Sequence, residues 1–185
     1  MNFGALKIDK TWSLFLDRDG VINTRIAGGY VKTWKQFEFI HGVKEAIALC
    51  SGHFGKIVVV SNQQGVGKGL MTEKEVEHIH EAMRSEISKN GGRIDAIYFC
   101  PFLDEDHSIM RKPNIGMALK ARKDFPDIRF KRSVMVGDSL SDMIFGKRLG
   151  MKTVFAGSDQ RLISGNAFLI DLAYPDLLMF ASALG

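Results

Sequence analysis

The sequence lacks the features that mark several large classes of protein. It has only two cysteines, Cys50 and Cys100, too few for a disulfide framework or for a zinc site built from cysteine alone. No apolar run approaches the ~20 residues that a membrane-spanning helix needs. Residues 1–10 contain no cationic stretch leading into an apolar core, as a secretory signal would. These absences predict a protein of the reducing cytoplasm without a membrane partner.

Internal repeats, low-complexity segments and long linkers rich in Pro, Gly or Ser are also missing. The chain has 185 residues, which suit one domain of ordinary size, so we expect residues 1–185 to form a single domain. Its net charge of +4 is mildly basic and is consistent with an anionic ligand. Because there is no dense Lys/Arg stripe with interleaved aromatic residues, a nucleic-acid partner is not favoured.

Short apolar runs alternate along the chain with segments of helical period. The runs are typical of strands that are buried on both faces of a parallel sheet, and we predict strands at Trp12–Leu16, Lys56–Val60, Ala96–Cys100, Val134–Val136 and Thr153–Phe155. We predict helices at Gly42–Leu49, from an N-cap at Thr72 to the Gly91–Gly92 pair, and at Asn114–Asp124, Leu140–Leu149 and Pro175–Leu184. This order predicts a doubly wound, three-layer α/β domain with a Rossmann-like parallel sheet.

Polar residues follow each of the first four predicted strands. In such a sheet, ligands bind beyond the carboxyl ends of the strands, so these residues are the candidates for a functional site. They are Asp17 and Asp19 after the first strand, Ser61, Asn62 and Gln63 after the second, Arg111 and Lys112 after the third, and Asp138 and Asp142 after the fourth. A single carboxylate at a strand end is commonly a helix cap or a solvated turn. Four polar clusters in register instead predict one shared site.

The chemistry of these residue types points to phosphate esters. Clustered carboxylates repel one another and need a cation, and Mg²⁺ is the natural guest of an oxygen-rich site. A carboxylate can attack phosphorus and form an aspartyl-phosphate when a metal and a lysine neutralise the phosphoryl oxygens. A second carboxylate two residues later can protonate the leaving oxygen and then deprotonate the attacking water. The sequence contains each part of this mechanism.

Four segments in order, namely DRDG after an apolar strand, a Ser-Asn pair, a loop lysine and GDSLSD, resemble the haloacid dehalogenase (HAD) superfamily of phosphatases. The resemblance spans roughly Leu14 to Gly157. The segments DRDGVIN, GGYVKTWKQFEFIHGV, SNQQGVGKGLMTE, RKPNIGM and VGDSLSDM are similar to the D,D-heptose 1,7-bisphosphate phosphatase family and its relative, the histidinol-phosphate phosphatase domain. A HAD-like fold is therefore implied.

The resemblance implies roles for the carboxylates. Asp17 would be the nucleophile and a Mg²⁺ ligand. Asp19 would be the general acid and base, and its backbone carbonyl would also bind the metal. Asp138 would be the third protein ligand, while Asp142 would support the site from behind the ligands.

The resemblance also implies residues that hold the substrate. Ser61 and Lys112 would bind the transferring phosphoryl group, and Arg111 would reach the sugar's remaining phosphate or its hydroxyls. Asn62 and Gln63 would be further substrate contacts. For Arg111 the alternative is an ion pair with the acidic turn that precedes it. His78 and His80, two residues apart on a helix, are a poor metal pair because they point in different directions.

One segment departs from the family pattern. Relatives carry a Cys-x-His pair and a Cys-x-Cys pair before Arg-Lys-Pro, where this chain has 100–102 (Cys-Pro-Phe) and 108–110 (Ser-Ile-Met). A structural zinc needs four N or S ligands, so we predict that zinc is absent. Residues 104–106 (Asp-Glu-Asp) are then expected to form a solvated acidic turn.

The spacing of the motifs leaves no room for a lid. A loop, a helix and a strand already fill the stretch from Asp17 to Ser61, and the same holds from Ser61 to Lys112. We therefore predict a HAD-like fold without a cap domain. Its open site would be bordered by Ile22–Phe37, Gly65–Met71 and Pro101–Met110.

The leading function is a Mg²⁺-dependent phosphomonoester hydrolase, expected to be a monomer, acting on a small sugar phosphate, D-glycero-D-manno-heptose 1,7-bisphosphate. Two other enzymes stay open: a histidinol-phosphate phosphatase and a nucleic-acid end-processing phosphatase. A pseudo-phosphatase that only binds its ligand would be expected to have lost Asp17, Asp19, Lys112 or Asp138, and all four are present.

Overall fold

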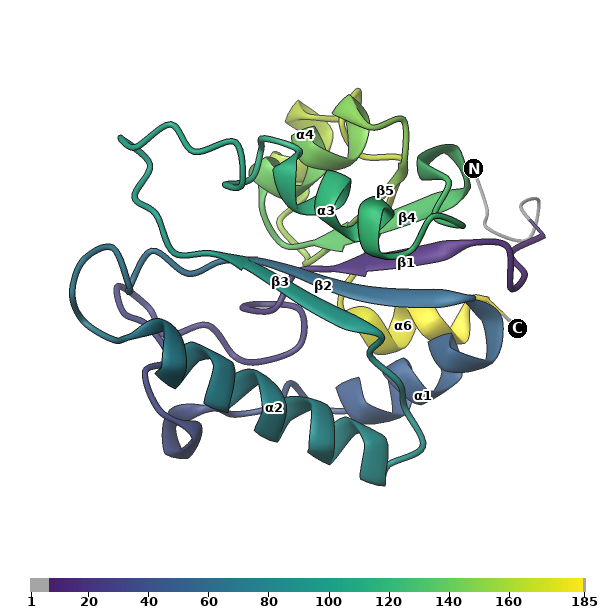
Figure 1. Cartoon of the computed structure of the whole chain (residues 1–185). Coiled ribbons are helices and arrows are strands. Elements are labelled where there is room, and N and C mark those ends of the chain that lie inside the picture. Colours follow the sequence, from purple (N-terminus) through teal and green to yellow (C-terminus); the bar gives the residue numbers. More distant parts are fainter. Residues whose placement is uncertain (1–6, 185) are drawn as a thin grey trace.

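The computed structural model describes residues 7–184 (Figure 1). Its centre is a six-stranded sheet with the order β3-β2-β1-β4-β5-β6, and every pairing between these strands is parallel. The strands are β1 (Ser13–Leu16), β2 (Lys56–Asn62), β3 (Ala96–Cys100), β4 (Ser133–Gly137), β5 (Lys152–Ala156) and β6 (Leu172–Tyr174). This is the doubly wound arrangement that the alternating pattern predicted.

Helices cover both faces of the sheet. They are α1 (Val43–His53), α2 (Glu73–Lys89), α3 (Gly116–Asp124), α4 (Leu140–Arg148), α5 (Gln160–Gly165) and α6 (Leu177–Ser182), with short 3₁₀ turns η2 (Trp34–Gln36) and η3 (Phe130–Arg132). In Figure 1, α1, α2 and α6 lie on one face, while α3 and α4 lie on the other. The three-layer prediction is confirmed.

The alternation of side chains along β1 explains why both faces are buried. Leu14 and Leu16 belong to the core cluster that contains residues of α1, α2 and α6. Phe15, between them, packs in the second cluster with residues of α3 and with Phe145 of α4. Successive strand residues point to opposite faces, so an uninterrupted apolar run is what a strand between two helical layers requires.

Several element boundaries differ from the predictions for local reasons. The helix predicted from Gly42 begins at Val43, because Gly42 is left-handed with φ of 71°. The helix predicted from Pro175 begins at Leu177, where Asp176 caps it by accepting a hydrogen bond from Met179 N. The N-cap at Thr72 and its capping box are confirmed. The starts of these helices are thus set by the backbone conformation of Gly42 and by the side-chain caps of Asp176 and Thr72.

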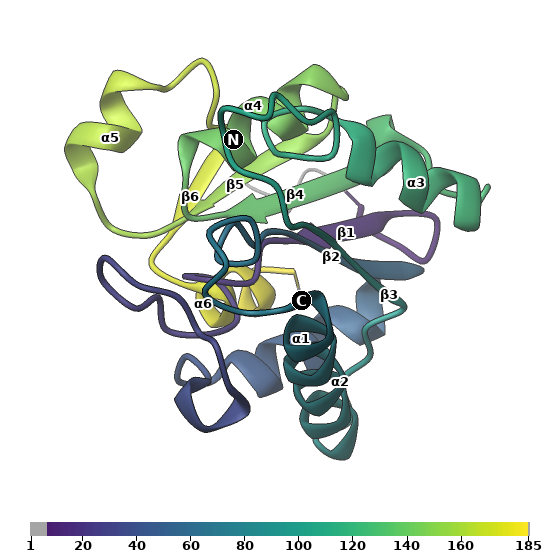
Figure 2. The same cartoon turned by 60° about the vertical axis from the view of Figure 1, so that its left-hand side comes forward.

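Strand β6 and helix α5 were not predicted, and neither were the 3₁₀ turns η2 and η3. Figure 2 shows β6 and α5 at the edge of the sheet opposite to β3. Strand β6 has only three residues, and they are exposed or half-buried, so it lacks the longer buried run that marks the inner strands. A short strand of this kind is recruited by its pairing with β5 rather than by its own sequence.

The long connections carry no folded lid in the part of the chain that the structure describes. Between β1 and β2 there are only η2 and α1, and α1 packs on the sheet as part of the core. Between β3 and α3 there is no helix or strand. Within residues 7–184, we find no helix with both the length and the apolar character to cross a membrane.

Candidate active site

The candidate residues gather where the strand order reverses. β1 lies between β2 and β4, and successive strands continue outward from it in both directions, so a crevice forms beyond the carboxyl ends of β1 and β4. Asp17 directly follows β1, and its backbone N–H donates to Val136 O of β4. Asp138 directly follows β4, and Ser61 lies near the end of β2. The topology therefore brings the predicted clusters to one edge of the sheet.

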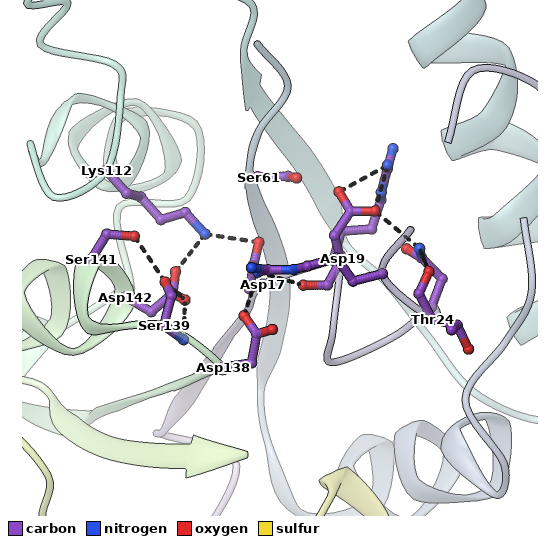
Figure 3. Close-up of polar contacts among 12 residues, drawn as sticks. Asp17, Asp19, Thr24, Ser61, Lys112, Asp138, Ser139, Ser141 and Asp142 are labelled. Carbon is purple, nitrogen blue, oxygen red and sulfur yellow. Dashed lines mark hydrogen bonds and ion pairs between the residues drawn. The ribbon is translucent and has the colours of Figure 1, made fainter. Parts of the chain in front are cut away.

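Lys112 lies between two buried carboxylates (Figure 3). Its Nζ is 2.8 Å from Asp17 Oδ1 and 2.6 Å from Asp142 Oδ1, and it also donates to Val60 O at 2.7 Å. Asn62 holds the backbone of Lys112 through two reciprocal hydrogen bonds of 3.0 Å. Burial alone would lower the pKa of Lys112, but Asp142 and Asp17 raise it above its usual value. The ammonium is therefore held charged beside Asp17.

Asp142 is fixed from behind by the start of α4. Its Oδ2 accepts hydrogen bonds from the hydroxyl and the backbone N–H of Ser139, at 2.5 Å and 3.2 Å. A side chain at Gly137 would collide with the Asp142 carboxylate, so only glycine fits there. Asp142 is fully buried and does not line the cavity, a placement that fits a supporting role.

The carboxylates form a cluster that suits a cation. Oxygen atoms of Asp17, Asp138 and Asp142 lie within 4.8 Å of one another. Burial raises the pKa of Asp17 to about 7, against the lowering effect of Lys112, and raises that of Asp138 to about 6, against the lowering effect of Arg25. Such shifts show that negative charge is costly there.

A cationic group contacts one oxygen of this cluster and one neighbouring backbone carbonyl. Arg25 Nη2 lies 2.7 Å from Asp138 Oδ1 and 3.2 Å from the backbone oxygen of Asp19. These carboxylate and carbonyl oxygens are the donor types that Mg²⁺ prefers. The donor set therefore fits Mg²⁺ held by Asp17, Asp138 and the Asp19 carbonyl.

Gly20 allows the first loop to approach Asp138. Its φ is +93°, in the region that favours glycine, and a Cβ at this position would collide with the Asp138 carboxylate. The glycine of the DRDG segment is therefore required by both backbone conformation and space.

The Asp19 carboxylate is held by three neighbouring side chains. Arg18 Nη2 donates to both of its oxygens at 2.8 and 2.9 Å, Asn23 Nδ2 donates at 2.9 Å, and Gln63 Nε2 donates at 2.8 Å. Gln63 Nε2 also lies 2.7 Å from Ser61 Oγ. Burial alone would raise the pKa of Asp19, but the Arg18 charge and these hydrogen bonds hold it below the usual value. Asp19 is therefore ionised in this environment.

A cavity of about 480 Å³ opens above these groups. The predicted residues that line it are Asp17, Asp19, Asn62, Gln63, Arg111 and Lys112. Arg25, Ile26, Gly28–Val31 and Lys68, from two of the predicted border segments, also line it, whereas no residue of the third predicted border, Pro101–Met110, is among the lining residues. Arg25, Lys68, Arg111 and Lys112 give the wall four cationic side chains, which favours an anionic ligand.

Arg111 makes the ion pair that the sequence left as an alternative. Its Nε lies 3.0 Å from Asp104 Oδ1, and its Nη2 donates to Gln64 Oε1 at 3.4 Å. The predicted acidic turn is confirmed, since residues 104–106 are exposed and form a turn. Arg111 nevertheless lines the cavity, so the pair with Asp104 and a substrate contact compete for the same guanidinium.

Sequence reasoning missed three residues at the site. Arg25 contacts Asp138, which is 113 positions away. Arg18 and His80 form a buried contact across 62 positions. No local pattern could have identified these pairs. For Arg18, the signal in the sequence was its position between two carboxylates, Asp17 and Asp19.

The chain is similar to known phosphatases over most of its length. Residues 14–165 match the family model described as polynucleotide kinase 3 phosphatase. A D-glycero-alpha-D-manno-heptose-1,7-bisphosphate 7-phosphatase from Mycobacterium bovis is 37% identical over 174 residues, covering 94% of this chain and 92% of the relative. A D-glycero-beta-D-manno-heptose-1,7-bisphosphate 7-phosphatase from Vibrio cholerae is 40% identical over 149 residues, covering 76% of this chain and 78% of the relative.

The fold is also similar to that of a solved structure. The crystal structure of D,D-heptose 1,7-bisphosphate phosphatase from B. bronchiseptica, complexed with magnesium and phosphate, matches with a TM-score of 0.83 and 28% identity. The match covers 94% of this chain and 97% of that one.

Proposed function

The chain belongs to the polynucleotide kinase 3 phosphatase family, and from this premise we propose that it hydrolyses a phosphate ester of D-glycero-D-manno-heptose 1,7-bisphosphate with Mg²⁺. The observation that carries the proposal is the placement of Asp17. Its carboxylate is buried, contacts the Lys112 ammonium at 2.8 Å and lines a cavity with a cationic wall. The similarity to heptose bisphosphate phosphatases supports the choice of sugar.

In the proposed first step, an oxygen of Asp17 attacks phosphorus and the ester P–O bond breaks, giving an aspartyl-phosphate and the sugar hydroxyl. Lys112 neutralises phosphoryl oxygens, and Ser61 provides a hydrogen bond. Asp19 gives the leaving oxygen its proton. A phosphate dianion beside Asp19 raises the pKa of that carboxyl, which favours the protonated form that this step needs.

In the proposed second step, water attacks the phosphorus of the aspartyl-phosphate, Asp19 accepts a proton from the water, and Asp17 is released with inorganic phosphate. The ionised form of Asp19 that its neighbours favour is the form that accepts this proton. Mg²⁺, when held by Asp17, Asp138 and the Asp19 carbonyl, neutralises the developing negative charge.

The second phosphate of the substrate would be bound by cationic residues of the cavity other than Lys112. Arg111, Lys68 and Arg25 also line the cavity. Arg111 is the residue proposed to bind the distal phosphate. Its partner Asp104 is 88% exposed, so their ion pair is weak and an anionic ligand can replace it.

A phosphate-release assay over a panel of esters tests the proposal. The panel contains both anomers of heptose 1,7-bisphosphate, because relatives named for each anomer match this chain. It also contains heptose monophosphates, histidinol phosphate and a 3′-phosphorylated DNA end. We expect the highest kcat/KM for a heptose bisphosphate, with loss of the 7-phosphate. A clear preference for histidinol phosphate or for the DNA end would contradict the proposed substrate.

We further propose that residues 1–185 act as one domain and as a cytoplasmic monomer. Sedimentation of the purified protein tests the oligomeric state. A dimer at micromolar concentration would contradict this part of the proposal.

A further inference from the structure

Arg18 is a buried charge with few partners. Its side chain is among the largest that are fully buried, and burying a guanidinium is costly unless its N–H groups are satisfied. Nη2 donates to Asp19, and Nη1 lies 3.2 Å from His80 Nε2. Among the described residues, Nε has no hydrogen-bond partner. The guanidinium is therefore held at two points, Asp19 and His80.

His80 is suited to accept a hydrogen bond from Arg18. It lies on α2, is 4% exposed, and its ring stands edge-on to Phe99 with the ring centroids 5.6 Å apart. Burial, and secondarily the Arg18 charge, lower its pKa to about 3, so the imidazole is neutral. A neutral imidazole with its proton on Nδ1 presents a lone pair at Nε2, which is the atom that faces Arg18.

These contacts form one chain from α2 to the Asp19 carboxylate. Without His80, the guanidinium would be held only through Nη2 and could swing away from Asp19. Asn23 and Gln63 contact different oxygens of that carboxylate, Oδ1 and Oδ2, so both oxygens have a second donor. Arg18 is the residue that contacts both oxygens and carries charge.

We propose that His80 is a positioning residue for proton transfer by Asp19, acting through the guanidinium of Arg18. The inference rests on the proposed phosphatase function, in which Asp19 protonates the leaving oxygen. A role in stability alone does not account for the arrangement, because well-packed apolar residues are often at least as stabilising as a buried ionic pair. Positioning a carboxylate for reaction requires the polar contacts.

The test is the dependence of kcat/KM on the leaving group. Phenyl phosphate needs a proton on its leaving oxygen, whereas the leaving group of 2,4-dinitrophenyl phosphate departs as an anion. For His80→Leu we expect a loss of about 10- to 100-fold on phenyl phosphate and of about twofold or less on the dinitrophenyl ester. Asp19→Asn is the reference and should show the same selectivity with a larger loss.

Two further variants control for side effects. His78→Leu makes the same change two residues earlier on α2, at an exposed position, and should leave both rates as in the wild type. His80→Gln keeps an acceptor that can reach Arg18 and should recover most of the activity on phenyl phosphate. Circular dichroism and a thermal melt establish that each variant is folded.

Equal losses of His80→Leu on both esters, or no loss on either, would overturn the proposal. If His80→Leu does not fold, Arg18→Lys replaces it, because one ammonium cannot contact Asp19 and His80 as the guanidinium does. It should show the same selective loss on phenyl phosphate, and a uniform loss or none would overturn the proposal. If the wild type hydrolyses neither these esters nor the heptose bisphosphate with Mg²⁺, the proposed function itself fails; if it hydrolyses the heptose bisphosphate alone, a selective loss in His80→Leu is expected in the kcat/KM for that substrate, and no loss there would overturn the proposal. If the wild type and Asp19→Asn behave as expected and His80→Leu does not, only the role of His80 fails.

Discussion

Two regions of the cavity differ in how far their ion pairs are exposed to water. At the floor, Lys112 is 3% exposed and lies between the buried carboxylates of Asp17 and Asp142. At the rim, Arg111 pairs with Asp104, whose side chain is 88% exposed. We call the first set (Asp17, Lys112, Asp142) the floor and the cationic set Arg25, Lys68 and Arg111 the rim. Water does not screen the floor, so its charges interact strongly and each needs its partner. At the rim, Arg25 and Lys68 are exposed, and half-buried Arg111 pairs with an exposed carboxylate, so these charges exchange partners at little cost.

This difference separates two functions within one cavity. The floor fixes the geometry around the proposed nucleophile, and a change there affects both chemistry and folding. The rim offers cations to whatever anion enters, so a change there affects which substrate is preferred. Changes at the floor are therefore expected to have larger effects than changes at the rim.

Asp17→Asn should reduce phosphate release to background. An amide cannot attack phosphorus and carries no charge for a metal, while its size keeps the packing at the end of β1. The measurement is phosphate release with Mg²⁺, together with circular dichroism to show that the variant is folded. Near-wild-type activity in the folded variant would rule out the covalent mechanism.

Chelation should abolish activity as completely as Asp17→Asn does. EDTA removes the cation that the Asp17–Asp138 cluster is proposed to hold, and Mg²⁺ alone should restore activity. Elemental analysis should find no stoichiometric zinc, because Phe102, Ser108 and Met110 stand where the family's remaining ligands would be. One zinc per chain, lost with thermal stability on chelation, would contradict the prediction.

Lys112→Met should destabilise the fold by about 3–5 kcal/mol in urea denaturation, because two buried carboxylates lose their counter-charge. The loss should shrink as the pH falls. Without Lys112 the pKa of Asp17 rises further above its unfolded value, so protonation at low pH favours the folded state. Lys120→Met, at an exposed position of α3, is the control and should change stability little. A loss that grows at low pH would show that the floor is not held by this charge pairing.

Arg111→Ala should reduce kcat/KM for the heptose bisphosphate by about 10- to 100-fold, since a guanidinium binds phosphate through charge-assisted, bidentate hydrogen bonds. The loss on p-nitrophenyl phosphate, which has no second phosphate, should be much smaller. The measurement is the ratio of the two losses in the same preparation. Equal losses would mean that Arg111 acts only through its ion pair with Asp104.

Arg25→Gln should have the smallest effect, a tightening of Mg²⁺ binding by about three- to fivefold in calorimetry. Arg25 Nη2 contacts Asp138 Oδ1 and the Asp19 carbonyl, two of the oxygens proposed to bind the metal, so it competes for them. Arg161→Gln removes the same charge from exposed α5 and should change the affinity less than twofold. Weaker binding in Arg25→Gln would show that the arginine does not compete with the metal.

The order of the elements and the edge at which the polar clusters meet could both be predicted from local sequence patterns. Runs such as Lys56–Val60 are apolar on both faces, and only a strand between two helical layers buries such a run. Asp17 and Asp138 directly follow their strands, and Ser61, predicted to follow β2, is its penultimate residue, so parallel pairing carries all three to one edge. The capping box at Thr72 could be predicted as well, because it is a contact between residues three positions apart.

Which polar groups contact one another at that edge depends on the tertiary packing and could not be predicted from the sequence. Arg25 reaches Asp138, and His80 reaches Arg18, across loops whose backbone conformations no local pattern specifies. Likewise, β6 forms through its parallel pairing with β5. The sequence left open whether Arg111 contacts the substrate or Asp104, and in the structure it pairs with Asp104. Hydrophobic periodicity is a property of neighbouring residues, whereas the partner of a charge is set by every element that packs around it.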